Sequence, residues 1–203
     1  QKFTLHTKVM VLGTLALNII GCILYWLLER HNAKTIGGLS EAGQWFASWF
    51  MAVTSRTAGF NNVDYSQITD ASTLLTFLLM FIGAGSMSTG GGIKIGTFMI
   101  ILASTRAYLR QHPQVTIFHR AISDHLVKKS FAVMSIAILM MALASFILTI
   151  FEPEGHLVDI LFEVISASST VGLSRNFTPT LSEPGQWVIM FMMYMGRLGP
   201  LTL

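Results

Sequence analysis

The chain has 203 residues, of which 52% are hydrophobic and only 11% are charged, with a formal net charge of +3. Soluble domains average about 25% charged residues, so this chain carries too few charges to cover a surface that faces water on all sides. The composition therefore argues against a soluble globular protein and favours an all-α integral membrane protein.

The first predicted element is a membrane-spanning helix. Residues 9–28 form a run of 20 residues without a charge, and about 20 apolar residues span the hydrocarbon core of a bilayer as a helix. The run is longer than the apolar part of a signal peptide, and no small-residue cleavage site follows it. We therefore expect it to be a membrane helix of the protein itself.

A short apolar segment follows at 41–54, and its length is informative. Its apolar centre, 42–53, would extend ~18 Å as a helix, which is too short to cross the bilayer. A segment that enters the membrane without crossing must turn back, and its non-helical part must be buried in protein or line a water-filled path. We therefore expect a re-entrant pore loop. The alternative is an amphipathic helix that lies on the membrane surface.

A Thr-x-Gly turn ends this segment at 55–60, and a second one, at 168–173, follows another short segment at 157–167. Potassium selectivity needs carbonyl oxygens that replace the hydration shell of the ion. Glycine readily takes the backbone angles that aim successive carbonyls at one axis. One such turn is a weak signal, but two in the same context favour an ion filter. We expect its residues, with potassium bound to them, to be Thr57, Ala58, Gly59, Phe60, Thr170, Val171, Gly172 and Leu173.

A glycine-rich segment interrupts the apolar stretch 71–109. An unbroken helix from residue 72 to residue 109 would extend ~57 Å, far more than the ~30 Å hydrocarbon core. Broken helices mark transport paths, so we expect a polar loop that gates the path below the filter. The alternative is close helix packing through small residues. The residues of the expected gate loop are Gly83, Gly85, Ser86, Ser88, Thr89, Gly90, Gly91 and Gly92.

Positive charges gather on one side of the predicted spans. Segments 1–8 and 94–129 together hold eight lysines and arginines against a single acid. Because positive residues stay cytoplasmic, we expect the N-terminus and 104–129 inside the cell, and 29–70 and 152–183 outside. Nucleic-acid binding would also explain a basic cluster, but we reject it because membrane topology already accounts for these residues.

The second half of the chain repeats the first. Aligning Gly59 with Gly172, an offset of 113, also pairs the threonines of the two turns. We therefore divide the chain into a first helix–pore loop–helix unit at 1–109, a cytoplasmic linker at 110–129 and a second unit at 130–203. The second unit holds an apolar run of 22 residues at 130–151, the short segment at 157–167, the turn at 168–173 and an apolar helix at 185–203.

The last apolar helix contains Arg197. An arginine deep in a membrane helix costs ~3 kcal/mol or more, so it normally faces the protein interior and is functional. We expect Arg197 to face the pore, where it acts as a barrier or anchors the gate loop. The alternative is that its side chain reaches out to the inner membrane interface.

These motifs together resemble the Trk/Ktr/HKT superfamily of potassium transporters, and most closely the Ktr membrane subunit. The resemblance covers nearly the whole chain. It is carried by Ser55-Arg56-Thr57-Ala58-Gly59-Phe60-Asn61, the glycine-rich stretch into Gly91-Gly92-Ile93-Lys94, Thr170-Val171-Gly172-Leu173-Ser174 and Gly196-Arg197-Leu198-Gly199-Pro200.

The resemblance implies potassium uptake across the cell membrane, with sodium as a second candidate ion. It implies a pore of four helix–loop–helix units, of which this sequence resembles the third and fourth, so that this part alone should not conduct. It also implies a membrane homodimer on a cytosolic regulatory ring that binds nucleotide. The nucleotide is then expected only on that partner, and no covalently bound cofactor is expected. Arg197 matches the pore-facing basic residue of the family.

Three other functions remain open from the residues alone. An intramembrane enzyme would need paired catalytic groups at membrane depth, and the apolar helices contain no paired carboxylates, Ser/His pair or metal cluster. A membrane scaffold subunit would explain the helices but not the two turns. A sodium-selective transporter would keep the same architecture, although the glycines at both turns favour potassium.

Overall fold

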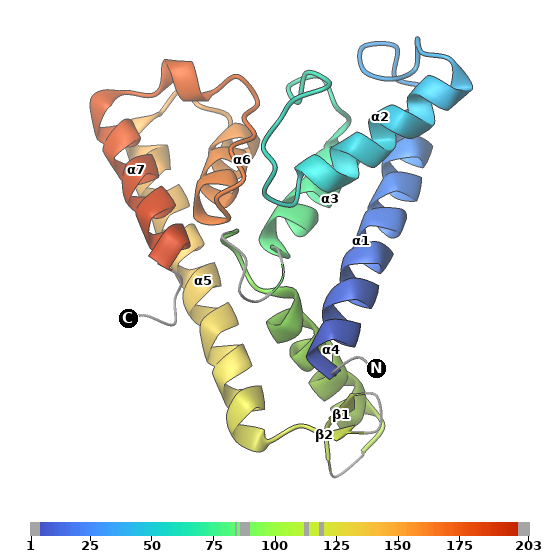
Figure 1. Ribbon diagram of the computed structural model, residues 1–203. Helices are drawn as coiled ribbons and strands as arrows, with labels where there is room; N and C mark the ends of the chain where they lie inside the picture. Colours follow the sequence, from blue (N-terminus) through green and yellow to red (C-terminus); the bar gives the residue numbers. More distant parts are fainter. Residues whose placement is uncertain (1–4, 84, 86–89, 112–113, 118–119, 199–203) are drawn as a thin grey trace.

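The computed structural model describes residues 5–83, 85, 90–111, 114–117 and 120–198, and it is mostly helical (Figure 1). Helices α1–α3 and helices α5–α7 form two groups that lie side by side, and α4 lies toward the opposite end of the molecule from α2 and α6. The elements are α1 (Leu5–Glu29), α2 (Glu41–Thr54), α3 (Asp70–Phe81), α4 (Ile95–Leu109), β1 (Thr116–Ile117), β2 (Arg120–Ala121), α5 (Asp124–Phe151), α6 (Leu157–Ser168), a 3-10 turn (Thr178–Thr180) and α7 (Glu183–Leu198).

Among the described residues, two helices have the length and composition to cross a membrane. They are Thr7–Glu29, within α1, and Asp124–Phe151, which is α5. Only 22% of the most apolar window of each helix is buried inside the molecule, and Leu139 on α5 is 69% exposed. An apolar surface of this extent fits the hydrocarbon core of a bilayer. The helices expected over 9–28 and 130–151 are confirmed, and α5 begins earlier because Asp124 favours a helix N-terminus.

The short helices expected near 41–54 and 157–167 are α2 and α6, with 14 and 12 residues. Ser40 precedes α2, and its hydroxyl accepts a hydrogen bond from the backbone N–H of Gly43 (3.3 Å), which fixes where the helix begins. Helix α2 packs against α1, while α6 packs against α5 and α7. Each short helix is therefore supported by at least one longer helix of its own unit, and α6 also contacts α3 of the other unit.

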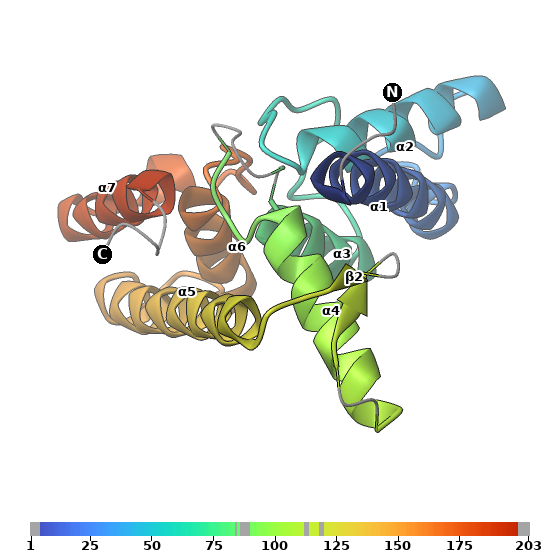
Figure 2. The same ribbon diagram turned by 60° about the horizontal axis from the view of Figure 1, so that its bottom comes forward.

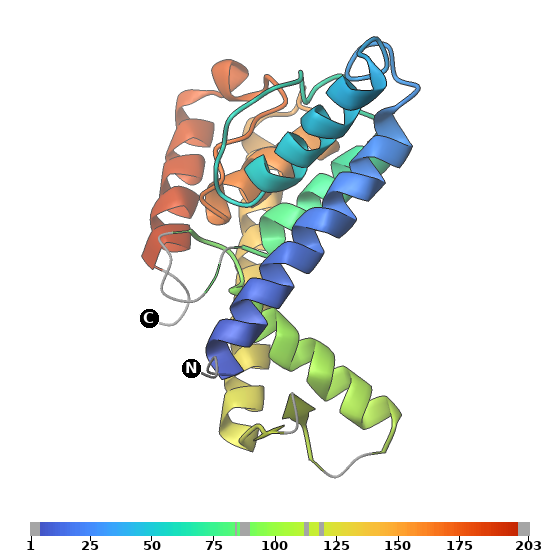
Figure 3. The same cartoon turned by 45° about the vertical axis from the view of Figure 1, so that its right-hand side comes forward.

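The apolar stretch 71–109 is broken into α3 and α4, as the glycines predict. The two helices are inclined to each other, as Figure 3 shows. The ends of the intervening segment are joined by backbone hydrogen bonds: Gly83 N–H donates to the Ile93 carbonyl (2.9 Å), and Ile93 N–H donates to the Phe81 carbonyl (3.0 Å). The segment 83–92, the glycine loop, is thus closed at its base.

In each unit a carboxylate joins the two long helices at the same point, buried at Glu29 and half-buried at Glu152. The Glu29 carboxylate, at the end of α1, accepts from the N–H and hydroxyl of Thr69, both at 2.8 Å. The Glu152 carboxylate, just after α5, accepts from the N–H (2.7 Å) and hydroxyl (2.6 Å) of Ser182. Thr69 and Ser182 are 113 positions apart, the offset that aligns the turns. The repeat therefore extends to side-chain contacts that the sequence alignment did not include.

The two units share a core. Tyr25 and Met80 from the first unit belong to one buried cluster with Phe162, Val171 and Leu173 from the second. The ring centroids of Tyr65 and Phe162 are 6.0 Å apart, within the range of favourable aromatic pairing. This cluster surrounds the second turn and fixes it against the first unit.

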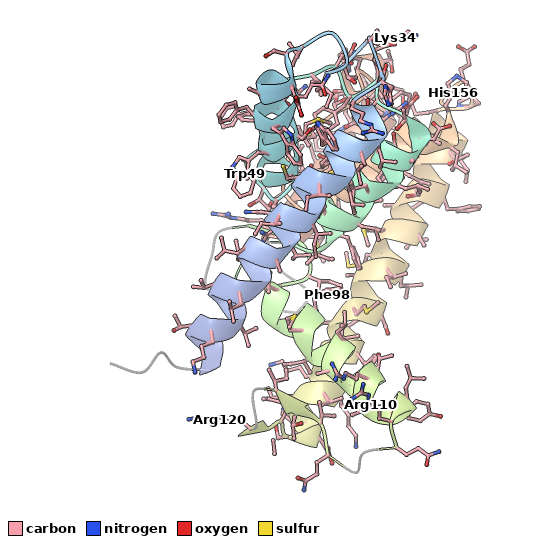
Figure 4. The ribbon with its side chains drawn as sticks, turned by 90° about the vertical axis from the view of Figure 1, so that its right-hand side faces the viewer. Lys34, Trp49, Phe98, Arg110, Arg120 and His156 are labelled. Atoms are coloured by element: carbon pink, nitrogen blue, oxygen red, sulfur yellow. The ribbon has the colours of Figure 1, made fainter. Side chains whose placement is uncertain are left out.

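The linker between the units contains a small antiparallel pair of strands that the sequence did not predict. Thr116 pairs with Ala121, and Ile117 pairs with Arg120; Figure 2 shows the chain passing from α4 through this pair to α5. In Figure 4, Arg110 and Arg120 lie at the end of the molecule opposite Lys34 and His156. The expected topology requires this separation. The division into 1–109, 110–129 and 130–203 stays a prediction.

Candidate functional site

The two Thr-x-Gly turns share an unusual backbone conformation. Thr57 and Gly59 have φ angles of 74° and 76°, and the equivalent Thr170 and Gly172 have φ angles of 53° and 92°. All four lie in the left-handed region, which glycine adopts freely and threonine rarely does. Strain of this kind persists only where the surrounding structure imposes it, and it is common at functional sites.

A hydroxyl group from the preceding short helix holds each turn. The Thr54 hydroxyl donates to the Phe60 carbonyl (2.7 Å) and accepts from the Phe60 N–H (2.8 Å). The Ser166 hydroxyl accepts from the Gly172 N–H (3.2 Å). Both contacts join residues six positions apart. Thr54 and Ser166 were not predicted as site residues, because their only signal in the sequence is a hydroxyl residue in the last turn of each short helix.

The two turns meet directly. A Cβ atom added to Gly59 would collide with the carbonyl oxygen of Val171, so only glycine permits this approach of the two backbones. Val171 and Leu173 are buried, with 5% and 1% of their surfaces exposed, whereas Phe60 is 70% exposed. Ala58 and Gly172 are also exposed. The structure therefore brings the eight expected filter residues into one region, with unequal burial.

The glycine loop contacts the second turn. The Gly91 N–H donates to the Thr170 hydroxyl oxygen (2.6 Å). A Cβ added to Gly91 would lie 2.9 Å from the Ser169 carbonyl carbon and from two side-chain atoms of Thr170, so the contact again requires glycine. The Lys94 ammonium group donates to the Gly90 carbonyl. Gly83, Gly85, Gly90, Gly91 and Gly92 of the expected gate loop are described, while Ser86, Ser88 and Thr89 lie outside the described residues.

The end of α7 packs beneath the second turn. A Cβ added to Gly196 would collide with the Ser168 carbonyl oxygen. Arg197 follows in the last turn of α7, with an exposed side chain, and it lies within electrostatic range of Lys94. The expected pore-facing cation is thus close to the base of the glycine loop. Its role as a latch stays a prediction.

A small cavity of about 40 Å³ lies between the second turn, the base of the glycine loop, α5 and α7. Phe81, Met140 and Met192 supply much of its apolar wall, and Ser169 supplies a hydroxyl. That hydroxyl is buried and has no hydrogen-bond partner among the described residues. The cavity adjoins the contact between loop and turn, so the packing there is incomplete.

Arg175 and Asn176, which follow the second turn, join the second unit to the first. The Arg175 guanidinium pairs with the Asp159 carboxylate (2.7 Å) and donates to the Tyr65 carbonyl (3.0 Å) and the Thr73 hydroxyl (2.9 Å). Nearby, the Asn176 amide donates to Asp64 (3.2 Å). Neither unit's sequence pattern indicated these contacts, because they depend on how the units pack.

Two carboxyl groups near the turns are held by hydroxyls. Glu163, buried on α6, accepts from the hydroxyls of Ser174 and Thr178, so it ties the segment after the second turn to the short helix. Asp64 is in the exposed loop after the first turn. Hydrogen bonds from the Ser66 hydroxyl and N–H lower the pKa of Asp64 below its ordinary value. Among the described residues, no group of three histidine, cysteine or acidic side chains could hold a metal ion.

The long apolar helices and the helical fold define an integral membrane protein. Comparison with known proteins gives its family: residues 2–203 match the profile of TrkH, described as a cation transport protein. The chain belongs to this family.

Two curated relatives are Ktr system potassium uptake protein B of Vibrio alginolyticus and of Bacillus subtilis (strain 168), each 44% identical, over 98% and 100% of this chain. The potassium/sodium uptake protein NtpJ of Enterococcus hirae is 35% identical over 100% of this chain. The chain spans 44%, 45% and 46% of the lengths of these relatives.

The fold is also that of a solved transporter. The crystal structure of the potassium transporter TrkH from Vibrio parahaemolyticus matches 92% of this chain with a TM-score of 0.77, at 18% sequence identity, and the match covers 41% of that chain. A match at this identity shows the fold alone. It supports the helical architecture, and the resemblance to the Trk/Ktr/HKT superfamily is confirmed by the family match.

Proposed function

We propose that this chain forms part of a potassium uptake pathway across the cell membrane, and that the first and second turns line the ion path. The observation that carries the proposal is the pairing of the turns: the same offset, the same left-handed positions and a direct contact between Gly59 and the Val171 carbonyl. The names of the two Ktr relatives, both potassium uptake proteins, support the choice of ion.

The physical basis is the geometry of backbone carbonyls. Potassium loses its hydration shell only where fixed oxygens replace it. An alternation of left-handed and ordinary residues, as in Thr57-Ala58-Gly59 and Thr170-Val171-Gly172, can turn successive carbonyls toward one side of the chain. In this proposal each unit is a re-entrant pore loop between two membrane helices, and two further units complete the ring of oxygens.

The test is Gly172→Ser in the full-length protein, with potassium and sodium uptake measured in cells that lack other potassium systems. A Cβ at Gly172 meets nothing within 4 Å, so the substitution acts through the φ of +92° rather than through a collision. We expect a weakened preference for potassium over sodium. Gly38→Ser is the matched control, since a Cβ there also meets nothing within 4 Å. Unchanged potassium affinity and selectivity in Gly172→Ser would contradict the proposal.

Sodium transport is the second candidate function, because the E. hirae relative is named a potassium/sodium uptake protein. The same assay separates the two, since a sodium pathway shows no preference for potassium in the unsubstituted protein. A non-transporting scaffold predicts no uptake that depends on either turn.

The glycine loop is the proposed gate. Its glycines allow two arrangements at modest energy, and its contact with Thr170 supports a position next to the proposed path. Arg197, near the base of the loop, is its proposed latch because a guanidinium offers five N–H donors to carbonyl and hydroxyl oxygens.

Regulation and assembly complete the proposal. The protein works as a membrane homodimer whose cytosolic face, including residues 104–129, docks a nucleotide-binding regulatory ring. The word "system" in the relatives' names supports the existence of further components. The N-terminus is cytoplasmic in this arrangement.

A further inference from the structure

We infer that Tyr25 is a positioning residue for the proposed ion path, because its hydroxyl holds Ser55, the first residue of the first turn. The first turn then owes the placement of its carbonyls to a buried hydroxyl network inside the first unit. This inference rests on the proposed function and adds a residue, remote from the ion, that maintains the preference for potassium.

The network consists of three fully buried hydroxyl groups. Tyr25 belongs to α1, Ser55 directly follows α2, and Thr76 belongs to α3; the exposed fraction of each residue is 0%. The Tyr25 hydroxyl oxygen lies 2.7 Å from Thr76 Oγ1 and 3.1 Å from Ser55 Oγ. One side chain therefore ties the start of the turn to both longer helices beside it.

The hydrogen atoms of this network can be assigned. The Ser55 hydroxyl donates to the Met51 carbonyl at 2.7 Å. The Thr76 hydroxyl donates to the Ser72 carbonyl, also at 2.7 Å. Each hydroxyl carries one hydrogen, so the Tyr25 hydroxyl supplies the hydrogen for both of its contacts. It shares that hydrogen between the two oxygens as a three-centre bond, and both contacts are lost when the hydroxyl is removed.

The contact with Ser55 acts on the strained part of the turn. Ser55 lies two residues before Thr57, whose φ of 74° is left-handed, and such strain persists only where the surrounding structure imposes it. The Thr54 hydroxyl holds the far end of the turn at Phe60, while Tyr25 holds its start. A turn that is fixed at both ends keeps its carbonyl oxygens where they replace the hydration shell of potassium, whereas a loosened turn can close around a smaller ion.

The second unit has apolar packing where the first has this network. Leu148 and Ile189 occupy the positions of the tyrosine and the threonine, at the offsets of 123 and 113 that also relate the two carboxylates and their partners. Both belong to one buried apolar cluster. Ser168, the equivalent of Ser55, donates to the Ile165 carbonyl of its own helix (3.1 Å). Among the described residues, the network is therefore specific to the first turn.

The experiment compares two buried tyrosines in the full-length protein. Tyr25→Phe removes the bonded hydroxyl and keeps the ring. Tyr65→Phe is the matched control, because Tyr65 is equally buried in the same core cluster. Its hydroxyl comes near Ser55 but forms no hydrogen bond with any described residue. Calorimetry on the purified protein gives the Kd for potassium and for sodium, and uptake into proteoliposomes gives the KM for each ion and the maximal rate.

The expected change follows from the loss of one hydrogen bond, which corresponds to about 2–10-fold in an equilibrium constant. Tyr25→Phe should weaken the preference for potassium over sodium by about that factor, in both the Kd ratio and the KM ratio. Tyr65→Phe should leave both ratios unchanged.

Two further variants separate the contacts of the shared hydrogen. Ser55→Ala should act like Tyr25→Phe, and the double variant should add little, because both changes remove the same contact. Thr76→Val removes the competing acceptor, so the whole hydrogen goes to Ser55 and the preference for potassium should be kept. A purely structural role predicts the opposite for Thr76→Val, since this substitution also cuts the tie to α3.

Equal ion preference in Tyr25→Phe and Tyr65→Phe overturns the inference. A loss confined to the maximal rate or to thermal stability, with both ratios unchanged, also overturns it. If Tyr25→Phe is not recovered as monodisperse protein, Ser55→Ala decides by the same criteria. The proposed function fails if the unsubstituted protein binds no potassium, and the inference falls with it. If the unsubstituted protein prefers potassium and Tyr25→Phe keeps that preference, only the inference fails.

Discussion

At the scale of single residues, the glycines of the two turns differ in what restrains them. Gly59 and Gly172 both have positive φ angles, but a Cβ would collide with the Val171 carbonyl only at Gly59. An L-residue in the left-handed region costs roughly 1–2 kcal/mol. The collision adds to this cost at Gly59, because the opposing atom belongs to the backbone of the other unit and cannot rotate away.

Gly59→Ala should therefore destabilise the full-length protein more than Gly172→Ala, which should cost only about 1–2 kcal/mol. The measurement is the temperature at which each detergent-solubilised variant loses its monodisperse peak in size-exclusion chromatography. Gly38→Ala is the control variant, because a Cβ at Gly38 meets no other atom within 4 Å and its midpoint should match that of the unsubstituted protein. Equal midpoints for the two variants would show that the close approach of the turns is absent in the assembled protein.

The sequence pattern predicted the residues of the two turns, but it did not predict the side chains that hold those turns in place. The repeated Thr-x-Gly pattern marked Thr57 and Gly59 because few residues other than glycine adopt such angles at low cost. Thr54 and Ser166 were not predictable, since a hydroxyl at a helix end has several local uses. The alignment at offset 113 does not pair Glu29 with Glu152, because these two residues are 123 positions apart. Their partners Thr69 and Ser182 are 113 positions apart. The segment from Glu29 to Thr69 is ten residues longer than the segment from Glu152 to Ser182.

At the scale of elements, length and composition predicted the helices well. The spans follow from bilayer thickness, and the break between α3 and α4 follows from the glycines. The strand pair β1–β2 was missed because each strand has two residues, too few to show a periodic pattern. The contact between the glycine loop and Thr170 joins residues 79 positions apart, so no local pattern could reveal it.

Deleting Gly85 to Gly91 should raise potassium flux, and Arg197→Ala should raise it too, because each removes one side of the contact proposed to hold the path closed. The double change should add little, since groups in contact are not additive. Ion preference should persist, because Thr54 and Ser166 hold the turns from their own helices. Uptake of potassium and sodium, normalised to expressed protein, is the measurement.

Two results would contradict this account of the gate. Lower maximal uptake in the deletion variant, with the protein still made and inserted, would show that the loop does not block the path. Independent multiplication of the two effects in the double variant would show that the loop blocks the path without Arg197 as its latch.

At the scale of the whole molecule, the contacts between units decide how the two turns face each other. The shared core around Phe162 and the hydrogen bonds of Arg175 to the Tyr65 carbonyl and the Thr73 hydroxyl join the first unit to the second. No sequence pattern within a single unit indicates either of these contacts. The sequence could therefore predict that two units exist, while their relative placement had to come from packing.

The orientation of the molecule in the membrane is testable by labelling. Arg110 and Glu154 are both exposed, and Arg110 lies at the end of the molecule opposite His156, the close neighbour of Glu154 in the chain (Figure 4). With single cysteines at these positions in a Cys22→Ser background, an impermeant thiol reagent applied to intact cells should label position 154 and spare position 110. The reason is that positive residues resist translocation, so we expect the basic linker on the cytoplasmic side. Permeabilised cells, in which both positions should label, are the control. Labelling of 110 alone in intact cells would invert the topology, so that the proposed gate would lie on the outer side of the turns and the regulatory ring could not dock on residues 104–129.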